Sequence, residues 1–176
     1  MSTNLSRAVS RALRHEPWLY ELELDDQGWV RLDVFVEALR RQGWPFLTSA
    51  DVEAMVATAT KPRHEVAEGW IRARYGHSLP GRINHSLATP PEFLFHGTAP
   101  QTVAIVGTEG LRPRQRQFVH LSADQETALA VGKRKASAPT VLTVAALRAA
   151  SAGVRFYEGS EKVWLADEVP PEFLSW

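Results

Sequence analysis

The sequence predicts an α+β fold in two parts, of which the first is helical and the second is mostly sheet. Three segments with helical spacing of apolar residues come first, and a short hairpin pattern follows them. After a stretch at 80–91 that is rich in Pro, Gly, Asn and Ser, the chain changes to short runs of β-branched and aromatic residues. We therefore expect two lobes, at residues 1–88 and 89–176.

The three predicted helices occupy the first sixty residues. Residues 4–15 repeat apolar side chains every three or four positions and leave arginines along another side, which by itself is typical of a solvated basic face. We expect Asp33 to cap a second helix that ends at Gly43, because a short polar side chain and a glycine mark those two positions. Ser49 is expected to open the third helix.

The hairpin pattern comes directly after these helices. Residues 63–66 alternate with period two, Glu68-Gly69 is typical of a turn, and residues 70–75 form a second extended run. Helices followed by such a hairpin indicate a winged-helix-like module.

The second lobe contains short strands with helical segments between some of them. Strands are expected at 93–95, 119–121, 140–144, 154–157 and 163–165. Helices are expected at 101–108 and 124–131, the latter with Ser122 and Gln125 placed as a capping box. This lobe is therefore predicted to be α+β.

Composition excludes several classes of protein and site. The absence of cysteine rules out disulfides, cysteine-ligated zinc and a thiol nucleophile. No apolar run approaches the ~18 residues that span a bilayer, and the first ten residues lack the apolar core of a signal peptide. We therefore expect a cytoplasmic protein with no membrane anchor.

Charge is neutral in sum but uneven along the chain. Twenty basic residues balance twenty acidic ones. Between residues 110 and 157, however, only Asp124 and Glu126 oppose eight basic residues: Arg112, Arg114, Arg116, Lys133, Arg134, Lys135, Arg148 and Arg155. The second lobe can therefore bind anions locally.

Four common catalytic or nucleotide-binding motifs are missing. No two glycines lie two positions apart, so a Rossmann G-x-G-x-x-G turn is excluded. Gly132-Lys133 lacks the other residues of a P-loop, and His15-Glu16 is not followed by the second histidine of a zinc protease. No serine stands in a G-x-S-x-G elbow.

The candidate functional residues are mostly basic. Arg14 and His15 close the first predicted helix, where the negative end of the helix dipole favours a cation. Arg63 stands at the start of the hairpin, and Arg116 lies in a basic loop. Each of these residues alone is typical of a protein surface.

The order of short motifs along the chain is more specific than any single residue. The motifs are LRHEP (13–17), LDDQGWV (24–30), KPR (61–63), IRA (71–73), GHS (76–78), PPEFLFHGT (90–98), VHLS (119–122) and VWL (163–165). On these motifs the chain resembles the RNA 2'-phosphotransferase family, known as KptA in bacteria, from end to end.

The resemblance implies a winged-helix-like lobe that binds RNA at 1–88 and a lobe with the ADP-ribosyltransferase fold that binds NAD at 89–176. That fold holds NAD in a split between small sheets and needs no Rossmann glycines. By motif, the family's essential quartet falls on Arg14, His15, Arg63 and Arg116. Contacts with NAD are carried over to His96, Gly97, Thr98, His120 and Ser122.

The implied reaction uses NAD as a co-substrate in two steps, an activity linked in this family to tRNA splicing. The RNA 2'-phosphate first displaces nicotinamide from NAD. The neighbouring ribose hydroxyl then attacks the transferred phosphate, releasing RNA and ADP-ribose 1'',2''-cyclic phosphate. His15 is the quartet member that can transfer a proton near neutral pH. We expect no metal cofactor and a monomer.

Two other functions are compatible with the same residues. One is an ADP-ribosyltransferase that modifies a protein or a phosphorylated nucleic-acid end and stops after the first step. The other is a nucleic-acid-binding module without catalysis. The four phosphate-binding groups disfavour a protein acceptor, and the HGT motif with Ser122 disfavours a module without catalysis.

Three positions depart from the family pattern. His64 stands where an aromatic residue usually follows K-x-R, and Tyr75 replaces a glutamine before GHS. Phe118 replaces a histidine just before VHLS, which removes a polar group beside the expected NAD site. The quartet itself is complete.

Overall fold

The computed structural model describes residues 2–176, which form two compact units that divide between Asn84 and His85. The sequence pattern placed the division at residue 88, four residues later. Residues 85–88 belong with the second unit because Leu87 forms a β-bridge with Tyr157. The N–H of Ala88 also donates to a main-chain carbonyl of strand β7, at 2.9 Å.

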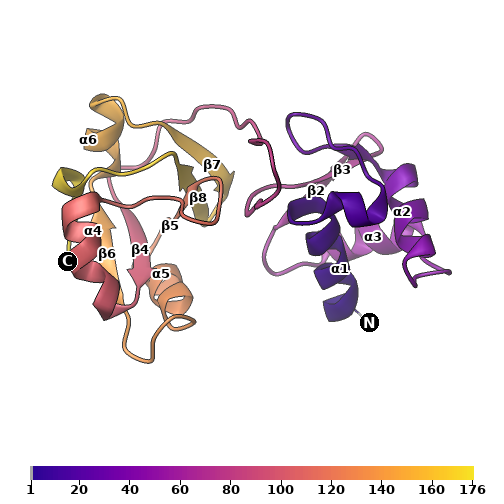
Figure 1. Ribbon diagram of the computed structural model, residues 1–176, viewed down its shortest axis with the longest axis horizontal. Helices are drawn as coiled ribbons and strands as arrows, with labels where there is room; N and C mark the ends of the chain where they lie inside the picture. Colours follow the sequence, from indigo (N-terminus) through magenta and orange to yellow (C-terminus); the bar gives the residue numbers. More distant parts are fainter. Residues whose placement is uncertain (1) are drawn as a thin grey trace. The chain divides into compact units, whose positions relative to one another are not determined.

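The first unit consists of short helices and a small antiparallel sheet (Figure 1). Its sheet has the strand order β1-β3-β2, and its hairpin turns at Glu68 and Gly69, both with positive φ. The elements are α1 (Ser2–Arg14), the 3₁₀ helix η1 (Pro17–Tyr20), β1 (Val30–Arg31), α2 (Leu32–Arg41), α3 (Ser49–Ala57), β2 (His64–Ala67) and β3 (Trp70–Ala73).

The apolar side of α1 fixes the position of its basic end. Val9, Ala12 and Leu13 are fully buried, and they join a core to which α2, α3 and β3 also contribute. Burial of such side chains stabilises the fold by roughly 1.5–3 kcal/mol for each Val or Leu. Because the core holds this face of the helix, the main chain of Arg14 in the last turn has a fixed position.

The second unit is built on a six-stranded antiparallel sheet with the strand order β7-β8-β5-β4-β6-β9. Its helical elements are η2 (Pro100–Thr102), α4 (Val103–Glu109), α5 (Gln125–Gly132), α6 (Ala146–Ser151) and η3 (Pro171–Phe173). Its strands are β4 (Leu94–Thr98), β5 (Val119–Ser122), β6 (Thr140–Val144), β7 (Phe156–Ser160), β8 (Val163–Ala166) and β9 (Leu174–Ser175). The α+β class is therefore confirmed.

The two faces of this sheet carry different helices (Figure 1). Leu94 and Leu142 lie in the core that α4 and α6 cover, whereas α5 packs against the opposite face at Gly97. A Cβ on Gly97 would lie 1.9 Å from the carbonyl oxygen of Ala128 in α5. Only glycine therefore allows α5 to approach β4 this closely.

Two predicted helix caps are wrong. α2 begins at Leu32, so Asp33 already lies in its first turn, where its carboxylate pairs with Arg31 at 2.9 Å. The residue that caps α5 is Asp124, whose side chain accepts a main-chain hydrogen bond from the first turn. Ser122 belongs to strand β5 instead.

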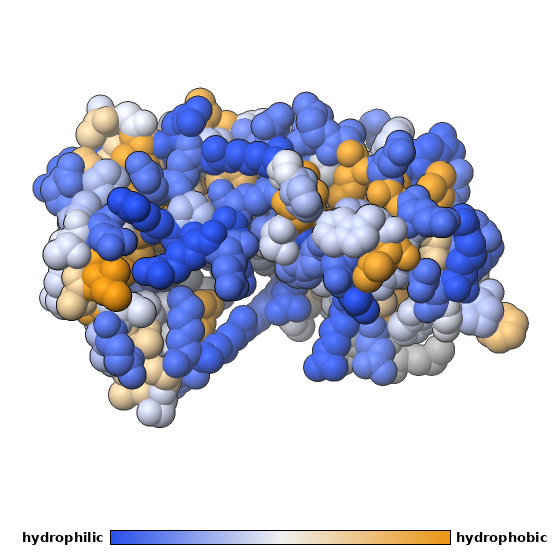
Figure 2. All heavy atoms as spheres, viewed as in Figure 1, coloured by the Kyte–Doolittle hydropathy of each residue, from blue (hydrophilic) through white to orange (hydrophobic). Residues whose placement is uncertain are grey.

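The surface drawn in Figure 2 is mainly hydrophilic on each unit, with hydrophobic residues in small separate groups. Among the helices of residues 2–176, none combines the length and apolar character that crossing a membrane requires.

His64 is a buried polar residue in the first unit, and the charges of two basic residues of the expected site act on it. Only 5% of its surface is exposed, and its Nε2 lies 3.1 Å from the hydroxyl of Ser10 on α1. Burial, with smaller contributions from the charges of Arg14 and Arg63, lowers the pKa of His64 from 6.5 to about 3. The ring is therefore neutral near pH 7, and it links β2 to α1.

This burial predicts a pH-dependent stability. The unfolded chain binds a proton at His64 below about pH 6.5, whereas the folded protein does so only near pH 3, so the free energy of unfolding falls as the pH is lowered. Between pH 6.5 and 4 the loss should be up to roughly 3 kcal/mol. Urea unfolding at several pH values should show this loss in the wild type and a smaller one in His64→Phe.

The pKa of His96 is also lowered, but His96 is present in both proteins, so its contribution to the pH dependence of unfolding is the same in both. Equal pH slopes for wild type and His64→Phe would contradict the assignment.

Candidate active site

Arg14 is held in place on several sides of its guanidinium group. One nitrogen donates a hydrogen bond to the main-chain carbonyl of Arg63 at 3.2 Å, and the group lies 5.3 Å from the centre of the Tyr75 ring. Gly76, with φ of 85°, gives it space, because a Cβ there would come within 3.3 Å of Arg14 Nη1. The charged group is therefore positioned before any ligand binds.

His15 is exposed at the end of α1 and is oriented by Ser78. Its Nδ1 lies 2.7 Å from the Ser78 hydroxyl, and the N–H of Ser78 donates to the carbonyl of Arg14 at 2.9 Å. One residue thus both satisfies a carbonyl at the helix end and fixes the imidazole. From the sequence, Ser78 of the GHS motif could structure the base of the hairpin or contact RNA, and neither role was assigned to it.

Arg63 is brought to the same place by the chain that leads into the hairpin. Its N–H donates to Lys61 O at 2.8 Å, and its carbonyl accepts from Arg74 N at 3.0 Å and from the Arg14 side chain. Its own side chain is half-buried. The first unit therefore gathers three of the four residues that the sequence singled out.

Two departures from the family pattern contribute to this arrangement. Tyr75 places the face of an aromatic ring against the Arg14 guanidinium, a favourable cation–π contact. His64 replaces an aromatic residue with a buried neutral imidazole that still fills the space and adds the contact with Ser10.

In the second unit, strands β4 and β5 separate soon after they meet. Their register has one pair, Phe95 opposite Ser122, whereas β4 and β6 pair along five residues. At this separation His96 Nδ1 donates a hydrogen bond to the main-chain carbonyl of His120 at 2.9 Å. Burial, and secondarily the charge of Lys135, lowers the pKa of His96 to about 4, so His96 is neutral near pH 7.

The remaining residues of the HGT motif have clear packing roles. Gly97 permits the close contact with α5 and accepts a hydrogen bond through its carbonyl. The Thr98 hydroxyl lies 2.7 Å from the Thr102 hydroxyl. The Thr102 hydroxyl donates its own hydrogen bond to the carbonyl oxygen of Ala99. Thr98 therefore donates to Thr102, and this pair ties the end of β4 to the helical turn that follows.

His120 and Ser122 lie on the face of the sheet opposite His96. Residues that pair directly across antiparallel strands share a face, and Ser122 pairs with Phe95, the neighbour of His96 in β4. The His120 ring donates from Nδ1 to Phe118 O at 3.1 Å, and Ser122 is buried. The predicted NAD residues are therefore divided between two faces of one sheet.

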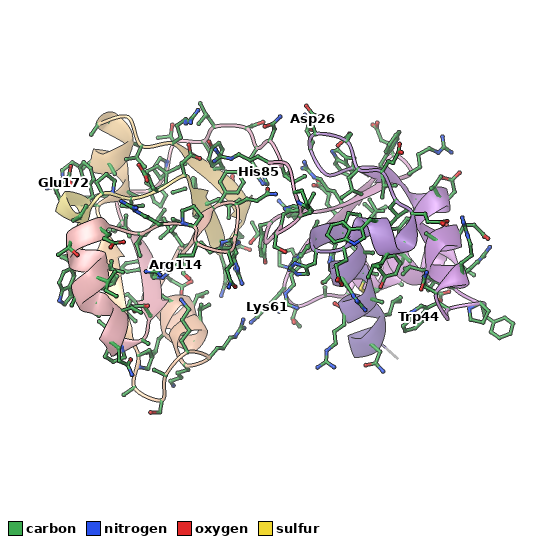
Figure 3. All side chains as sticks on the ribbon, in the orientation of Figure 1. Asp26, Trp44, Lys61, His85, Arg114 and Glu172 are labelled. Atoms are coloured by element: carbon green, nitrogen blue, oxygen red, sulfur yellow. The ribbon has the colours of Figure 1, made fainter. Side chains whose placement is uncertain are left out.

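Arg116 is an exposed residue of the loop between α4 and β5. The same loop contains Arg114, labelled in Figure 3, whose φ is 57°. The N–H of Arg116 donates to Pro113 O at 3.1 Å, which closes a tight turn. Arg116 belongs to the second unit, so the predicted quartet is divided between the two units.

Lys135 is a further basic residue at this site. Its ammonium group donates to Gly97 O at 3.1 Å, and its charge affects His96. Sequence reasoning counted it only as part of a basic stretch, because the contact joins residues 38 positions apart.

Phe118 belongs to an aromatic cluster rather than to a polar site. Its ring makes edge-to-face contacts with His85 and Tyr157, at centroid distances of 5.1 and 5.2 Å. His85, labelled in Figure 3, thus anchors the start of the second unit. The change from histidine removes a polar group but supplies packing at this end of β5.

The described residues of the chain contain no group of three or more His, Asp or Glu side chains arranged to hold a metal ion.

Comparison with known proteins accounts for almost the whole chain. The model of the RNA 2'-phosphotransferase, Tpt1 / KptA family matches residues 1–168. A probable RNA 2'-phosphotransferase of Bacillus thuringiensis subsp. konkukian is 49% identical over 98% of this chain and 94% of its own length. Proteins of the same name in two other organisms are also similar. The one from Acetivibrio thermocellus is 47% identical over 98% of this chain and 95% of its own length, and the one from Pyrococcus abyssi is 37% identical over 97% of this chain and 92% of its own length. The chain therefore belongs to the RNA 2'-phosphotransferase, Tpt1 / KptA family.

Proposed function

We propose that this protein removes an internal 2'-phosphate from RNA by transferring it to NAD, with release of nicotinamide and ADP-ribose 1'',2''-cyclic phosphate. Its family consists of RNA 2'-phosphotransferases that use NAD as co-substrate. The observation that carries the proposal is the group formed by Arg14, His15 and Arg63, which main-chain and side-chain contacts hold together in the first unit. Such a group suits a phosphate dianion.

We assign the first unit to RNA and the second to NAD. The first unit combines the basic group with a hairpin after three helices, as a winged-helix-like lobe does. In the second unit the separation of β4 and β5 brings main-chain groups and the neutral His96 ring together. These polar groups suit a polar dinucleotide. Arg116, in the loop before β5 of the same unit, adds a positive charge.

In the first step the RNA 2'-phosphate attacks the anomeric carbon of the nicotinamide ribose, and nicotinamide leaves with the bonding electron pair. Nicotinamide is already a good leaving group, so the protein's main task is to position the phosphate. Arg14 suits this task because its own orientation is fixed by the Arg63 carbonyl and the Tyr75 ring. Arginine also matches phosphate oxygens with paired N–H donors.

In the second step the ribose O2'' hydroxyl gives up its proton and attacks the transferred phosphorus, and the RNA 2'-oxygen leaves with the bonding electron pair and takes up a proton. The crowded phosphorus centre then carries more negative charge, and each well-aligned arginine contact contributes about 1.5–3 kcal/mol. We assign the proton transfer to His15. Its orientation by Ser78 through Nδ1 supports this assignment, because a fixed imidazole presents Nε2 in one direction.

The direct test is to incubate the purified protein with an oligonucleotide that carries an internal 2'-phosphate, with and without NAD. We expect the phosphate to be lost only when NAD is present. A chelator should leave the rate unchanged, because the proposal assigns charge balance to arginines. Undiminished dephosphorylation without NAD would indicate a phosphatase and contradict the proposal.

Arg116 and Arg114 provide a matched pair in one loop. Arg116→Ala should reduce activity at least about tenfold more than Arg114→Ala, because we assign a phosphate contact to Arg116 alone and such a contact contributes about 1.5 kcal/mol or more. Rates for both variants at saturating NAD would measure the difference. Equal losses would mean that the loop acts as a diffuse basic surface.

The His15→Ala variant should separate the two chemical steps. Loss of proton transfer should slow the second step by about 100 to 10,000-fold while the first continues, so that ADP-ribosylated 2'-phospho-RNA accumulates. Single-turnover assays with labelled RNA would show this species.

Arg14→Ala and Arg63→Ala are the controls for the His15 experiment. Both should weaken phosphate positioning in both steps and therefore give less intermediate relative to unreacted RNA. If His15→Ala instead consumes no RNA, histidine is needed for the first attack or for binding, and the step assignment is wrong.

A further inference from the structure

The segment of residues 75–78, just after strand β3, contacts both basic residues at the end of α1. The centre of the Tyr75 ring lies 5.3 Å from the Arg14 guanidinium group. The hydroxyl of Ser78 lies 2.7 Å from Nδ1 of His15. One short stretch of chain therefore sets the direction of two neighbouring side chains to which we assign different tasks.

The buried ring of His77 anchors this segment. Only 2% of the surface of His77 is exposed. A Cβ on Gly28, whose φ is 83°, would lie 3.4 Å from His77 Nε2 and 3.6 Å from the end of the Ile83 side chain, so the ring packs closely against this loop. Because the ring is enclosed, the main chain on either side of it has a fixed position, from which Tyr75 and Ser78 reach the end of α1.

Ser78 contacts the end of α1 in two ways that can be separated. Its main-chain N–H donates to the carbonyl of Arg14 at 2.9 Å, and this bond does not depend on the side chain. The hydroxyl contact with His15 is a second, exposed hydrogen bond. The main-chain bond already ties the segment to the helix, so the specific effect of the hydroxyl is on the direction of the imidazole.

We propose that two residues of this segment are positioning residues for the reaction. Ser78 acts through His15, and Tyr75 acts through Arg14. The inference rests on the proposed function, which supplies the tasks of His15 and Arg14. A hydroxyl can donate to a bare nitrogen or accept from an N–H, so the Ser78 contact suits both the neutral and the protonated ring. Because this contact occupies Nδ1, proton transfer falls to Nε2.

The two contacts predict different kinetic defects. Loss of the Ser78 hydroxyl should affect only the step in which His15 transfers a proton, because the hydroxyl acts on the imidazole alone. The Tyr75 ring holds a guanidinium group whose charge stays the same throughout the reaction. Loss of the ring should therefore weaken phosphate positioning in both steps.

Paired variants test each contact. Ser78→Ala removes the hydroxyl and keeps the main-chain bond, whereas Ser78→Thr keeps both. Tyr75→Leu removes the ring, and Tyr75→Phe keeps it. Ser10→Ala is the matched control, because its hydroxyl contacts His64 at 3.1 Å, a histidine to which we assign no step. Single-turnover time courses with labelled RNA give a rate constant for each step, and thermal unfolding is recorded for every variant.

We expect Ser78→Ala to slow the same step as His15→Ala, by about 2- to 12-fold, which is the effect of one hydrogen bond. The other step should be unchanged, and Ser78→Thr should recover most of the loss. A protein with both His15→Ala and Ser78→Ala should be no slower than His15→Ala, because the hydroxyl acts only through the imidazole.

We expect Tyr75→Leu to slow both steps by about 2- to 5-fold, the effect of an exposed cation–π contact, and Tyr75→Phe to remain near the wild type. Ser10→Ala should leave the ratio of the two rate constants unchanged, whatever its melting temperature.

Three results would overturn the inference. Unchanged rate constants in Ser78→Ala, or a loss that multiplies with that of His15→Ala in the double variant, would mean that the hydroxyl does not act through His15. Equal rates for Tyr75→Leu and Tyr75→Phe would show that the ring does not position Arg14. Failure of the proposed function would be visible separately, because the wild type would then not remove the 2'-phosphate in the presence of NAD.

Discussion

Repulsion between like charges is the physical constraint on which this site depends. Unit charges a few ångströms apart at a protein surface repel by on the order of 1–4 kcal/mol, and flexible arginines normally avoid that cost by moving apart. In the first unit the rest of the structure holds two such charges in place. Arg14 is fixed by the main-chain carbonyl oxygen of Arg63 and by the Tyr75 ring. A phosphate that binds such a group gains the energy that the repulsion had cost.

The hydrophobic cores offset this repulsion because they fix the elements that carry the charges. In the first unit, the buried side of α1 determines the position of the helix end that carries Arg14 and His15. In the second, Gly97 and Gly132 allow α5 to rest on β4, and the turn that follows delivers Lys135. The alternatives of a binding module without catalysis, or of a transferase that stops after one step, fit less well with a family match across both units.

Sequence reasoning recovered most of the elements but few of the contacts. The hairpin was predictable because alternation and the Glu68-Gly69 turn are local signals. The strands β1 and β9, of two residues each, carry too little pattern to detect. Asp33 and Ser122 were misassigned as caps because a polar residue near a helix start does not by itself fix the start. The Lys135 contact depends on chain folding, and no spacing rule could indicate it.

The central claim is that the RNA 2'-phosphate is transferred to the ADP-ribose part of NAD, and following the phosphorus atom tests it most directly. An oligonucleotide labelled with ³²P in its internal 2'-phosphate is incubated with the protein and NAD, and the labelled products are separated. The account predicts that the label leaves the RNA and appears in ADP-ribose cyclic phosphate. Label in inorganic phosphate, or label that stays on RNA as an ADP-ribosylated end product, would contradict it.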